Sequence, residues 1–281
     1  MLERKAYAKI NLTLAVTGKR PDGYHTLASV MQEITLCDLI RAEKAPEGIH
    51  FRCDEPSLPA DEKNLCVRAA KAYLDAAGNP GGVTLELEKK IPAGAGLGGG
   101  SSDAASTLTL LSELYPADVD LFALAAALGA DVPFFLTGGT CLCTGIGEIV
   151  QPLFFPAKEA LWCVVAQEDA PLSTPAVYKA YDELAPERER PSITEVVEAM
   201  TWGDPEAVYP FLFNDLEAPA YTLMPGIRET RNYLKALNAD ATLMTGSGSA
   251  VFALFRQQEL AAWAAANIKK KGAKTFLCRL I

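Results

Sequence analysis

The sequence has few of the residues that hold metal ions or bind nucleic acids. Its 281 residues include only two histidines, and none of its seven cysteines forms a Cys-x-x-Cys pair. Structural zinc sites need closely spaced Cys and His ligands, so no zinc site is expected, and scattered thiols are typical of a reducing compartment. The net charge of −9 disfavours nucleic acid as a partner, because the phosphate backbone binds clustered lysines and arginines.

Long hydrophobic runs are also missing. No stretch approaches the roughly 20 apolar residues of a membrane-spanning helix, and the first residues lack the apolar segment of a signal peptide. These absences predict a cytoplasmic protein without membrane contact. The chain is long enough for one large or two medium domains. A change of pattern around two prolines near residue 155 predicts a domain of residues 1–155 and a second of residues 156–281.

The residue patterns predict a mixed α/β fold. Residues 1–16 alternate apolar and polar side chains, as in a strand with one apolar and one polar face. Strands are expected at residues 1–16, 30–40, 83–87, 161–167, 241–244, 250–255 and 275–280, and a strand followed by a turn at residues 140–150. Helices are expected at residues 64–77, 104–114, 120–128, 174–184, 228–237 and 259–270. A turn is expected at residues 20–23 and a charged loop at residues 185–191.

The most informative segment is a glycine-rich loop, residues 92–103, between a predicted strand and a predicted helix. Its five glycines allow positive φ angles, and the following helix start offers unpaired N–H groups, so the segment predicts a phosphate site. The glycine spacing matches the dinucleotide fingerprint, but a second helix follows where a strand is needed. No Gly-Lys-Ser/Thr follows either, which excludes a P-loop. A flexible turn without a ligand is the alternative.

Lys9 and Asp131 are candidates for proton transfer. Lys9 lies on the polar face of the first strand beside Asn11, where it is either solvated or paired with an anion. Asp131 precedes Val-Pro-Phe-Phe, a pattern typical of a helix N-cap with proline in the first turn. A carboxylate at that position could also accept a proton from a substrate hydroxyl.

A second glycine-rich segment, residues 244–250, lies between two predicted strands. It contains Gly246, Ser247 and Gly248. Serine and glycine are good turn formers, so an ordinary hairpin turn is one interpretation. The other is a nest of backbone N–H groups that contacts the acceptor or the phosphate.

Together, these segments resemble a known family. Residues 6–12, 20–25, 92–103, 129–135 and 245–249, in this order, are similar to motifs of the GHMP kinases. These small-molecule kinases are named for galactokinase, homoserine, mevalonate and phosphomevalonate kinases. The resemblance covers nearly the whole chain. It implies a two-domain α/β (α+β) fold, with a ribosomal S5 domain-2-like N-terminal domain, a ferredoxin-like C-terminal domain and the active site between them.

The resemblance also implies a reaction. ATP, with Mg²⁺, would phosphorylate a hydroxyl of a small cytidyl substrate of non-mevalonate isoprenoid synthesis, in a monomer or weak homodimer. The sequence assigns no protein ligand to Mg²⁺. One alternative is a kinase of homoserine or mevalonate, which would not need the aromatic pair Tyr24 and His25. Another is a catalytically silent nucleotide-binding module, which would not need Lys9 and Asp131.

Individual residues receive roles from the resemblance. Lys9 and Asp131 match the catalytic pair. The residues expected to bind ATP are Asn64, Pro92, Ala93, Gly94, Ala95, Gly96, Leu97, Gly98, Gly99, Gly100, Ser101 and Ser102. The residues expected to bind the acceptor are Asn11, Tyr24, His25, Tyr178, Gly246, Ser247 and Gly248. Tyr178 would cover the cytosine ring, and a core aromatic on a helix face is the alternative.

Overall fold

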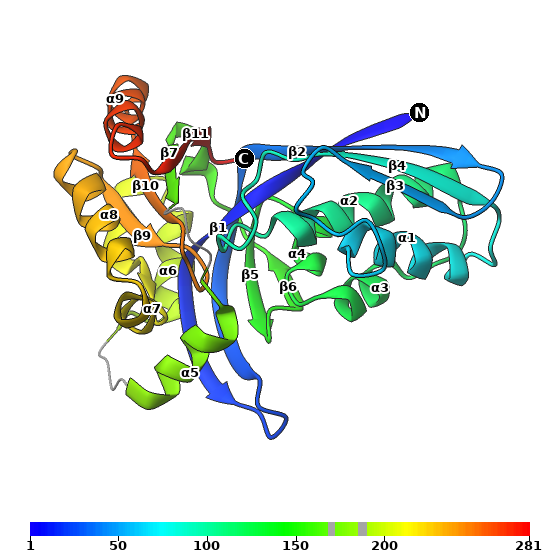
Figure 1. Ribbon diagram of the computed structural model, residues 1–281. Coiled ribbons are helices and arrows are strands. Elements are labelled where there is room, and N and C mark those ends of the chain that lie inside the picture. The colour runs from blue at the N-terminus through cyan, green and yellow to red at the C-terminus, as the bar shows by residue number, and fades with distance from the viewer. Residues whose placement is uncertain (168–171, 185–189) are drawn as a thin grey trace.

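The fold is built on two β-sheets (Figure 1). The structure, a computed structural model, describes residues 1–167, 172–184 and 190–281. The charged loop predicted at residues 185–191 therefore lies mostly outside the described residues. A mixed sheet, an antiparallel sheet and the helices that cover them confirm the predicted α/β class.

Two long antiparallel strands form the centre of the first sheet. They are β1 (Leu2–Lys19) and β2 (His25–Ala45), joined by the predicted turn. In the part of the chain that the structure describes, this sheet has seven strands. The other five are β3 (Ile49–Cys53), β4 (Gly82–Glu88), β5 (Thr140–Gly145), β6 (Ile149–Pro152) and β8 (Phe213–Asn214). β8 pairs in parallel with β1, and β3 pairs in parallel with β4.

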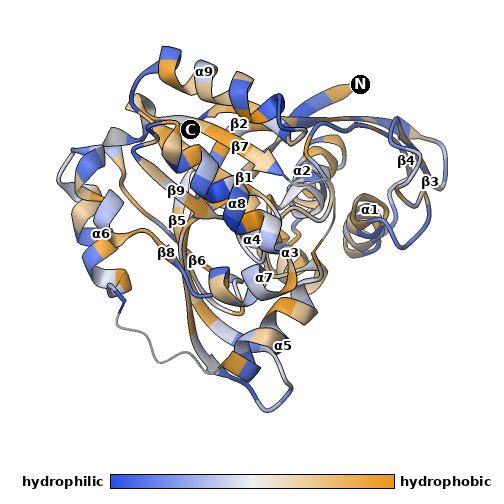
Figure 2. Ribbon diagram, turned by 60° about the vertical axis from the view of Figure 1, so that its left-hand side comes forward, coloured by the Kyte–Doolittle hydropathy of each residue, from blue (hydrophilic) through white to orange (hydrophobic). Residues whose placement is uncertain are grey.

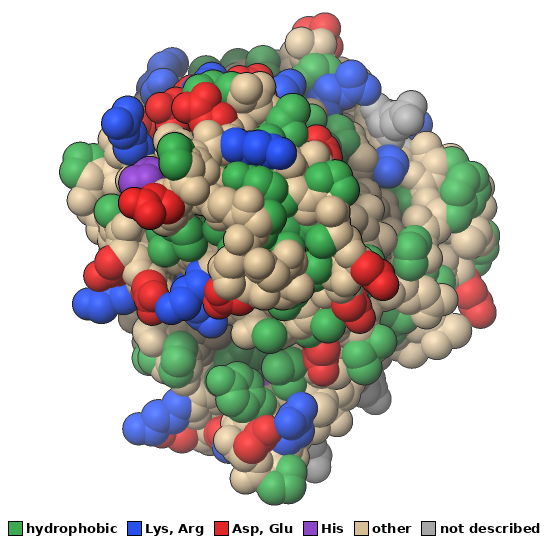
Figure 3. All heavy atoms as spheres, turned by 90° about the vertical axis from the view of Figure 1, so that its right-hand side faces the viewer, with side chains coloured by type: hydrophobic (Ala, Val, Ile, Leu, Met, Phe, Trp, Pro, Cys, Tyr) green, Lys and Arg blue, Asp and Glu red, His purple; other side chains and the backbone are tan. Residues whose placement is uncertain are grey.

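One face of the first sheet is covered by helices (Figure 1). These are α1 (Leu65–Ala76), α2 (Gly99–Leu114), α3 (Leu121–Leu128) and α4 (Val132–Thr137). α2 lies against both central strands and carries the glycine-rich loop at its start. The surface over this half mixes basic and acidic side chains on the face seen in Figure 3.

The second sheet is antiparallel, in the order β11-β7-β10-β9. Its strands are β7 (Trp162–Gln167), β9 (Ala241–Met244), β10 (Val251–Phe255) and β11 (Lys274–Arg279). The helices of this half are α5 (Thr174–Leu184), α6 (Ile193–Thr201), α7 (Glu217–Leu223), α8 (Pro225–Ala236) and α9 (Gln258–Lys269). Short 3₁₀ helices occur at Pro156–Ala160, Pro205–Ala207 and Tyr209–Phe211. β7 is hydrophobic along most of its length, whereas α8 mixes hydrophobic and hydrophilic residues (Figure 2).

The two sheets share a buried core. Ile10 and Val30 of the first sheet belong to the same cluster of buried residues as Val165 and Phe252 of the second. Burial of such side chains stabilises each by about 1.5–3 kcal/mol relative to exposure. Strand β1 also contacts both glycine-rich segments, because Lys9 N donates to the carbonyl of Leu97 and Asn11 N donates to Thr245 Oγ1.

The structure refines the predicted elements. α2 begins at Gly99, five residues before the predicted start, because its first turn is built from the glycine-rich loop itself. The polar face of β1 is buried, with Lys9, Asn11 and Thr13 shielded from solvent. The boundary proposed near residue 155 falls between β6 and β7 and stays a prediction.

Candidate active site

Two adjoining cavities lie around the glycine-rich loop. The larger has a volume of about 750 Å³ and is lined by the β1–β2 hairpin, α5 and the loop between β9 and β10. The smaller has a volume of about 360 Å³ and is lined by the glycine-rich loop and the start of α1. Gly96 and Gly98 line both cavities, so the two meet at the loop. We call them the acceptor cavity and the nucleotide cavity, after the ligands that the sequence predicts for their lining residues.

Lys9 is held at the junction by a chain of hydrogen bonds. Its Nζ donates to Asn11 Oδ1 at 2.7 Å, and Asn11 Nδ2 donates to Ser29 Oγ at 2.7 Å. The Ser29 hydroxyl in turn donates to the carbonyl of Thr13 at 2.6 Å. This chain fixes the Asn11 amide with its oxygen toward the ammonium group, as a buried lysine requires.

Asp131 faces Lys9 across the acceptor cavity. Its Oδ2 lies 3.7 Å from Lys9 Nζ. The Asp131 side chain is 32% exposed to solvent, whereas the Lys9 side chain is only 4% exposed. The predicted N-cap position is correct, since α4 begins at the next residue with Pro133 in its first turn, but the side chain makes no capping bond. The carboxylate is therefore open to the cavity and can accept a proton from a bound hydroxyl.

The glycine-rich loop is tied to both halves of the chain. Lys9 N donates to the carbonyl of Leu97 at 3.0 Å, and Ala250 N donates to the carbonyl of Ala95 at 3.2 Å. Gly96 has φ +77°, and an added Cβ would lie 2.4 Å from the carbonyl oxygen of Thr245. Only glycine fits such a position, because both the backbone angle and the space exclude a side chain.

The loop between β9 and β10 closes the junction from the other side. Thr245 Oγ1 accepts a hydrogen bond from Asn11 N at 3.0 Å, and Asn214 Nδ2 donates to the carbonyl of Gly246 at 2.8 Å. Gly246 and Ser247 line the acceptor cavity, whereas Gly248 lines neither cavity. Asn214 lies in β8, a strand that the sequence patterns did not reveal.

The aromatic residues expected at the acceptor end all line the acceptor cavity. His25 and Tyr178 stack directly, with ring centroids 4.8 Å apart and planes 19° from parallel. Tyr24 is 63% exposed. Burial and the negative charge of Asp131 raise the pKa of Tyr178 to about 12, so its hydroxyl stays protonated at neutral pH.

Asp182 is a residue of this region that the sequence analysis missed. Its carboxylate bonds His25 Nε2 at 2.7 Å and Lys19 Nζ at 2.5 Å. The hydrogen bond from Lys19 is the main cause that lowers the pKa of Asp182, and the bond to His25 acts in the same direction. Asp182 follows Tyr178 by four residues, which places both on one face of α5 and was the available signal.

At the nucleotide end, Asn64 has a structural role. It caps α1 by accepting from Cys66 N at 2.9 Å, and its Nδ2 donates to the carbonyl of Pro59 at 2.9 Å. It also lines the nucleotide cavity with residues 92–101. Ser102 is buried and does not line it.

Comparison with known proteins identifies the family. The family models "GHMP kinases N terminal domain" and "GHMP kinases C terminal" match residues 64–139 and 196–274. A relative from Thermus thermophilus, named 4-diphosphocytidyl-2-C-methyl-D-erythritol kinase, is 44% identical over 96% of this chain and 94% of its own.

Solved structures agree with this assignment. A 4-(cytidine 5'-diphospho)-2C-methyl-D-erythritol kinase is 42% identical with a TM-score of 0.86 and covers 99% of both chains. A homoserine kinase from Cytophaga hutchinsonii has a TM-score of 0.72 at 20% identity, covering 99% of this chain and 97% of its own, and shows the fold alone. The chain belongs to the GHMP kinase family.

Proposed function

We propose that this kinase transfers the γ-phosphoryl group of ATP to the 2-hydroxyl of 4-diphosphocytidyl-2-C-methyl-D-erythritol, in the non-mevalonate isoprenoid pathway. The observation that carries the proposal is the meeting of the two cavities at Gly96 and Gly98. Lys9 packs against Gly98, and Asp131 lies 3.7 Å from Lys9 Nζ on the acceptor side. The named relatives at 42–44% identity support this acceptor over homoserine or mevalonate.

In the proposed mechanism, the chain's own residues position both reactants. Asp131 accepts the proton of the substrate's 2-hydroxyl, and the hydroxyl oxygen forms a bond to the γ-phosphorus. The bond between the γ-phosphorus and the β,γ-bridging oxygen breaks, and ADP leaves. Lys9 stabilises the developing negative charge beside Asp131. Backbone N–H groups at the start of α2, a helix of 16 residues, face the phosphates.

Mg²⁺ accompanies ATP in this proposal and would offset phosphate charge. Among the described residues, no three His, Cys, Asp or Glu side chains gather where they could hold a metal ion. We therefore assign no protein ligand and no step to the ion.

The setting of the reaction is also part of the proposal. We propose a cytoplasmic enzyme that acts on a small molecule, without a nucleic acid or membrane partner, as a monomer or weak homodimer. Within the described ranges, no helix combines the length and the apolar character needed to cross a bilayer.

The proposed reaction predicts acceptor-dependent release of ADP. Purified protein with MgATP should form ADP rapidly only when 4-diphosphocytidyl-2-C-methyl-D-erythritol is present, as a coupled ADP assay can measure. Homoserine and mevalonate serve as the control acceptors. Equal turnover with either of them would refute the substrate assignment, and no turnover with any acceptor would favour a silent nucleotide-binding module.

The predicted stacking of Tyr178 on the cytosine ring is tested by substitution. We expect Tyr178→Ala to weaken acceptor binding by about 1–3 kcal/mol, the usual value of base–aromatic stacking, and to raise the KM for the acceptor but not for ATP. Tyr178→Phe keeps the ring and should retain a near-normal KM. A sharp loss of melting temperature with an unchanged acceptor KM would identify Tyr178 as a core residue that supports His25.

A further inference from the structure

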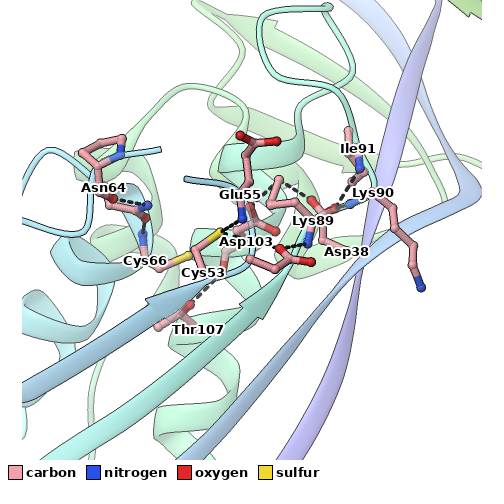
Figure 4. Close-up of polar contacts among 12 residues, drawn as sticks. Asp38, Cys53, Glu55, Asn64, Cys66, Lys89, Lys90, Ile91, Asp103 and Thr107 are labelled. Atoms are coloured by element: carbon pink, nitrogen blue, oxygen red, sulfur yellow. Dashed lines mark hydrogen bonds and ion pairs between the residues drawn. The ribbon is translucent and has the colours of Figure 1, made fainter. Parts of the chain in front are cut away.

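A buried cluster of charges borders the nucleotide cavity. The Lys89 ammonium lies between the carboxylates of Asp38 and Asp103, as Figure 4 shows. It bonds Asp38 Oδ2, and it donates to Asp103 Oδ2 at 2.8 Å. Both carboxylates are almost fully shielded from solvent, and the Lys89 side chain is 10% exposed. The proposed phosphoryl transfer does not use this cluster.

Asp38 is satisfied within the chain. Its Oδ1 accepts from the backbone N of Lys90 at 2.5 Å and of Ile91 at 2.8 Å, and its Oδ2 bonds Lys89. Asp38 therefore anchors the segment between β4 and the glycine-rich loop, and it holds the lysine that in turn holds Asp103.

Asp103 is not satisfied in the same way. Its Oδ1 is buried and has no hydrogen-bond partner among the described residues. The nearby Thr107 hydroxyl donates to the main-chain carbonyl of Asp103 at 2.8 Å and not to the carboxylate. A buried carboxylate oxygen without a donor is costly, and Asp103 lines the nucleotide cavity. A donor on the ligand is the natural partner for this oxygen.

The lining of the cavity indicates which part of a nucleotide lies there. The glycine-rich loop offers backbone N–H groups, which suit the phosphates. A carboxylate repels phosphate, so we place the base of the nucleotide, and not its phosphates, against Asp103. Apolar side chains of Leu58, Pro59, Leu65 and Leu87 complete the lining and suit a flat purine ring.

We propose that Asp103, held in place by Lys89, accepts a hydrogen bond from the 6-amino group of adenine and so selects adenine nucleotides over those with a 6-carbonyl group. The inference rests on the proposed use of this cavity by ATP. Hypoxanthine presents a carbonyl oxygen where adenine presents an amino group, so two acceptors would face each other and the buried oxygen would stay unpaired.

The first test compares the affinities of ADP and inosine diphosphate, which differ only at this edge of the base. The unmodified protein should bind ADP about 10–100-fold more tightly, the usual effect of a hydrogen bond to a charged group. In Asp103→Asn the amide oxygen faces Lys89 and the NH₂ group takes the place of Oδ1, so the preference should vanish or reverse. Asp54→Asn is the matched control, because the exposed Asp54 carboxylate accepts only from the backbone N of Lys89 at 2.9 Å and, weakly, from Cys53 Sγ at 3.9 Å among the hydrogen bonds described, and an amide oxygen can accept both.

The second test needs no variant. Burial raises the pKa of Asp103 to about 7; the nearby Lys89 ammonium lowers this pKa, and the nearby Asp38 carboxylate raises it. The neutral thiols of Cys53 and Cys66 also lie near Asp103. An amino donor favours the ionised carboxylate and lowers this pKa, so binding of ADP near pH 7 should release protons. A carbonyl favours the protonated carboxyl, so inosine diphosphate should take protons up. The preference for ADP should therefore grow as the pH rises through about 7.

Calorimetry in buffers with different ionisation heats measures both effects. The phosphates of the two ligands titrate alike, so the difference in proton release reports on the base. Equal affinity and equal proton release for ADP and inosine diphosphate would overturn the role of Asp103 while leaving the kinase proposal intact. Failure of the protein to bind either nucleotide would overturn both.

Discussion

Replacing Asp131 by asparagine is expected to lower kcat by about 10²–10⁴-fold, the usual contribution of a positioned general base. Asparagine keeps the shape of the side chain but cannot take the hydroxyl proton. Because Asp131 makes no capping bond, the substitution should change the melting temperature and the affinity for ATP little. Single-turnover kinetics and thermal melting of the same preparation measure these effects.

Lys9→Met provides the comparison for that result. Methionine fills the same space but removes the ammonium 3.7 Å from the Asp131 carboxylate. If the pair acts as one unit, the double variant should be scarcely slower than either single variant. Losses that multiply would show that Lys9 acts independently, chiefly on the phosphate. Near-normal kcat in Asp131→Asn would leave Asp131 without a role as a base.

Local patterns predicted the long elements of the fold because their signals lie within one segment. The alternation along β1 is an example. The short elements were missed for physical reasons. β8 has two residues and exists only through its pairing with β1, and α7 contains Pro219, which breaks the helical pattern.

The candidate site was only partly accessible from the sequence. The roles of Lys9 and Asp131 came from family resemblance, because residues 122 positions apart share no local spacing. The pairs Asp182–His25 and Lys89–Asp103 likewise join residues that are far apart in the sequence and meet only in the folded chain. A second signal, besides the spacing of Tyr178 and Asp182, was present and unused: Asp38 interrupts an apolar strand, and a buried carboxylate requires partners.

Gly98→Val is expected to lower kcat/KM by about 10²-fold, comparable to the cost of a small misplacement of a catalytic group. Gly98 has φ +72°, and an added Cβ would lie 2.7 Å from Phe135 Cζ and 3.1 Å from Lys9 Cγ. A β-branched residue resists this backbone conformation at a cost of about 1–3 kcal/mol. The displaced loop would weaken ATP binding, and the displaced lysine would slow phosphoryl transfer.

Gly100→Ala separates this effect from the mere addition of a methyl group. Gly100 lies in the same loop, but an added Cβ would meet only Leu65 Cδ1 at 3.6 Å, an ordinary contact. The affinity of the Gly100→Ala variant for ATP should therefore fall far less than that of the Gly98→Val variant. Circular dichroism establishes that both variants are folded, and calorimetry measures their affinity for ATP. Equal affinities in the two variants would mean that the positive φ and tight packing at Gly98 do not shape the phosphate site, and the loop's role in ATP binding would then depend on its backbone N–H groups alone.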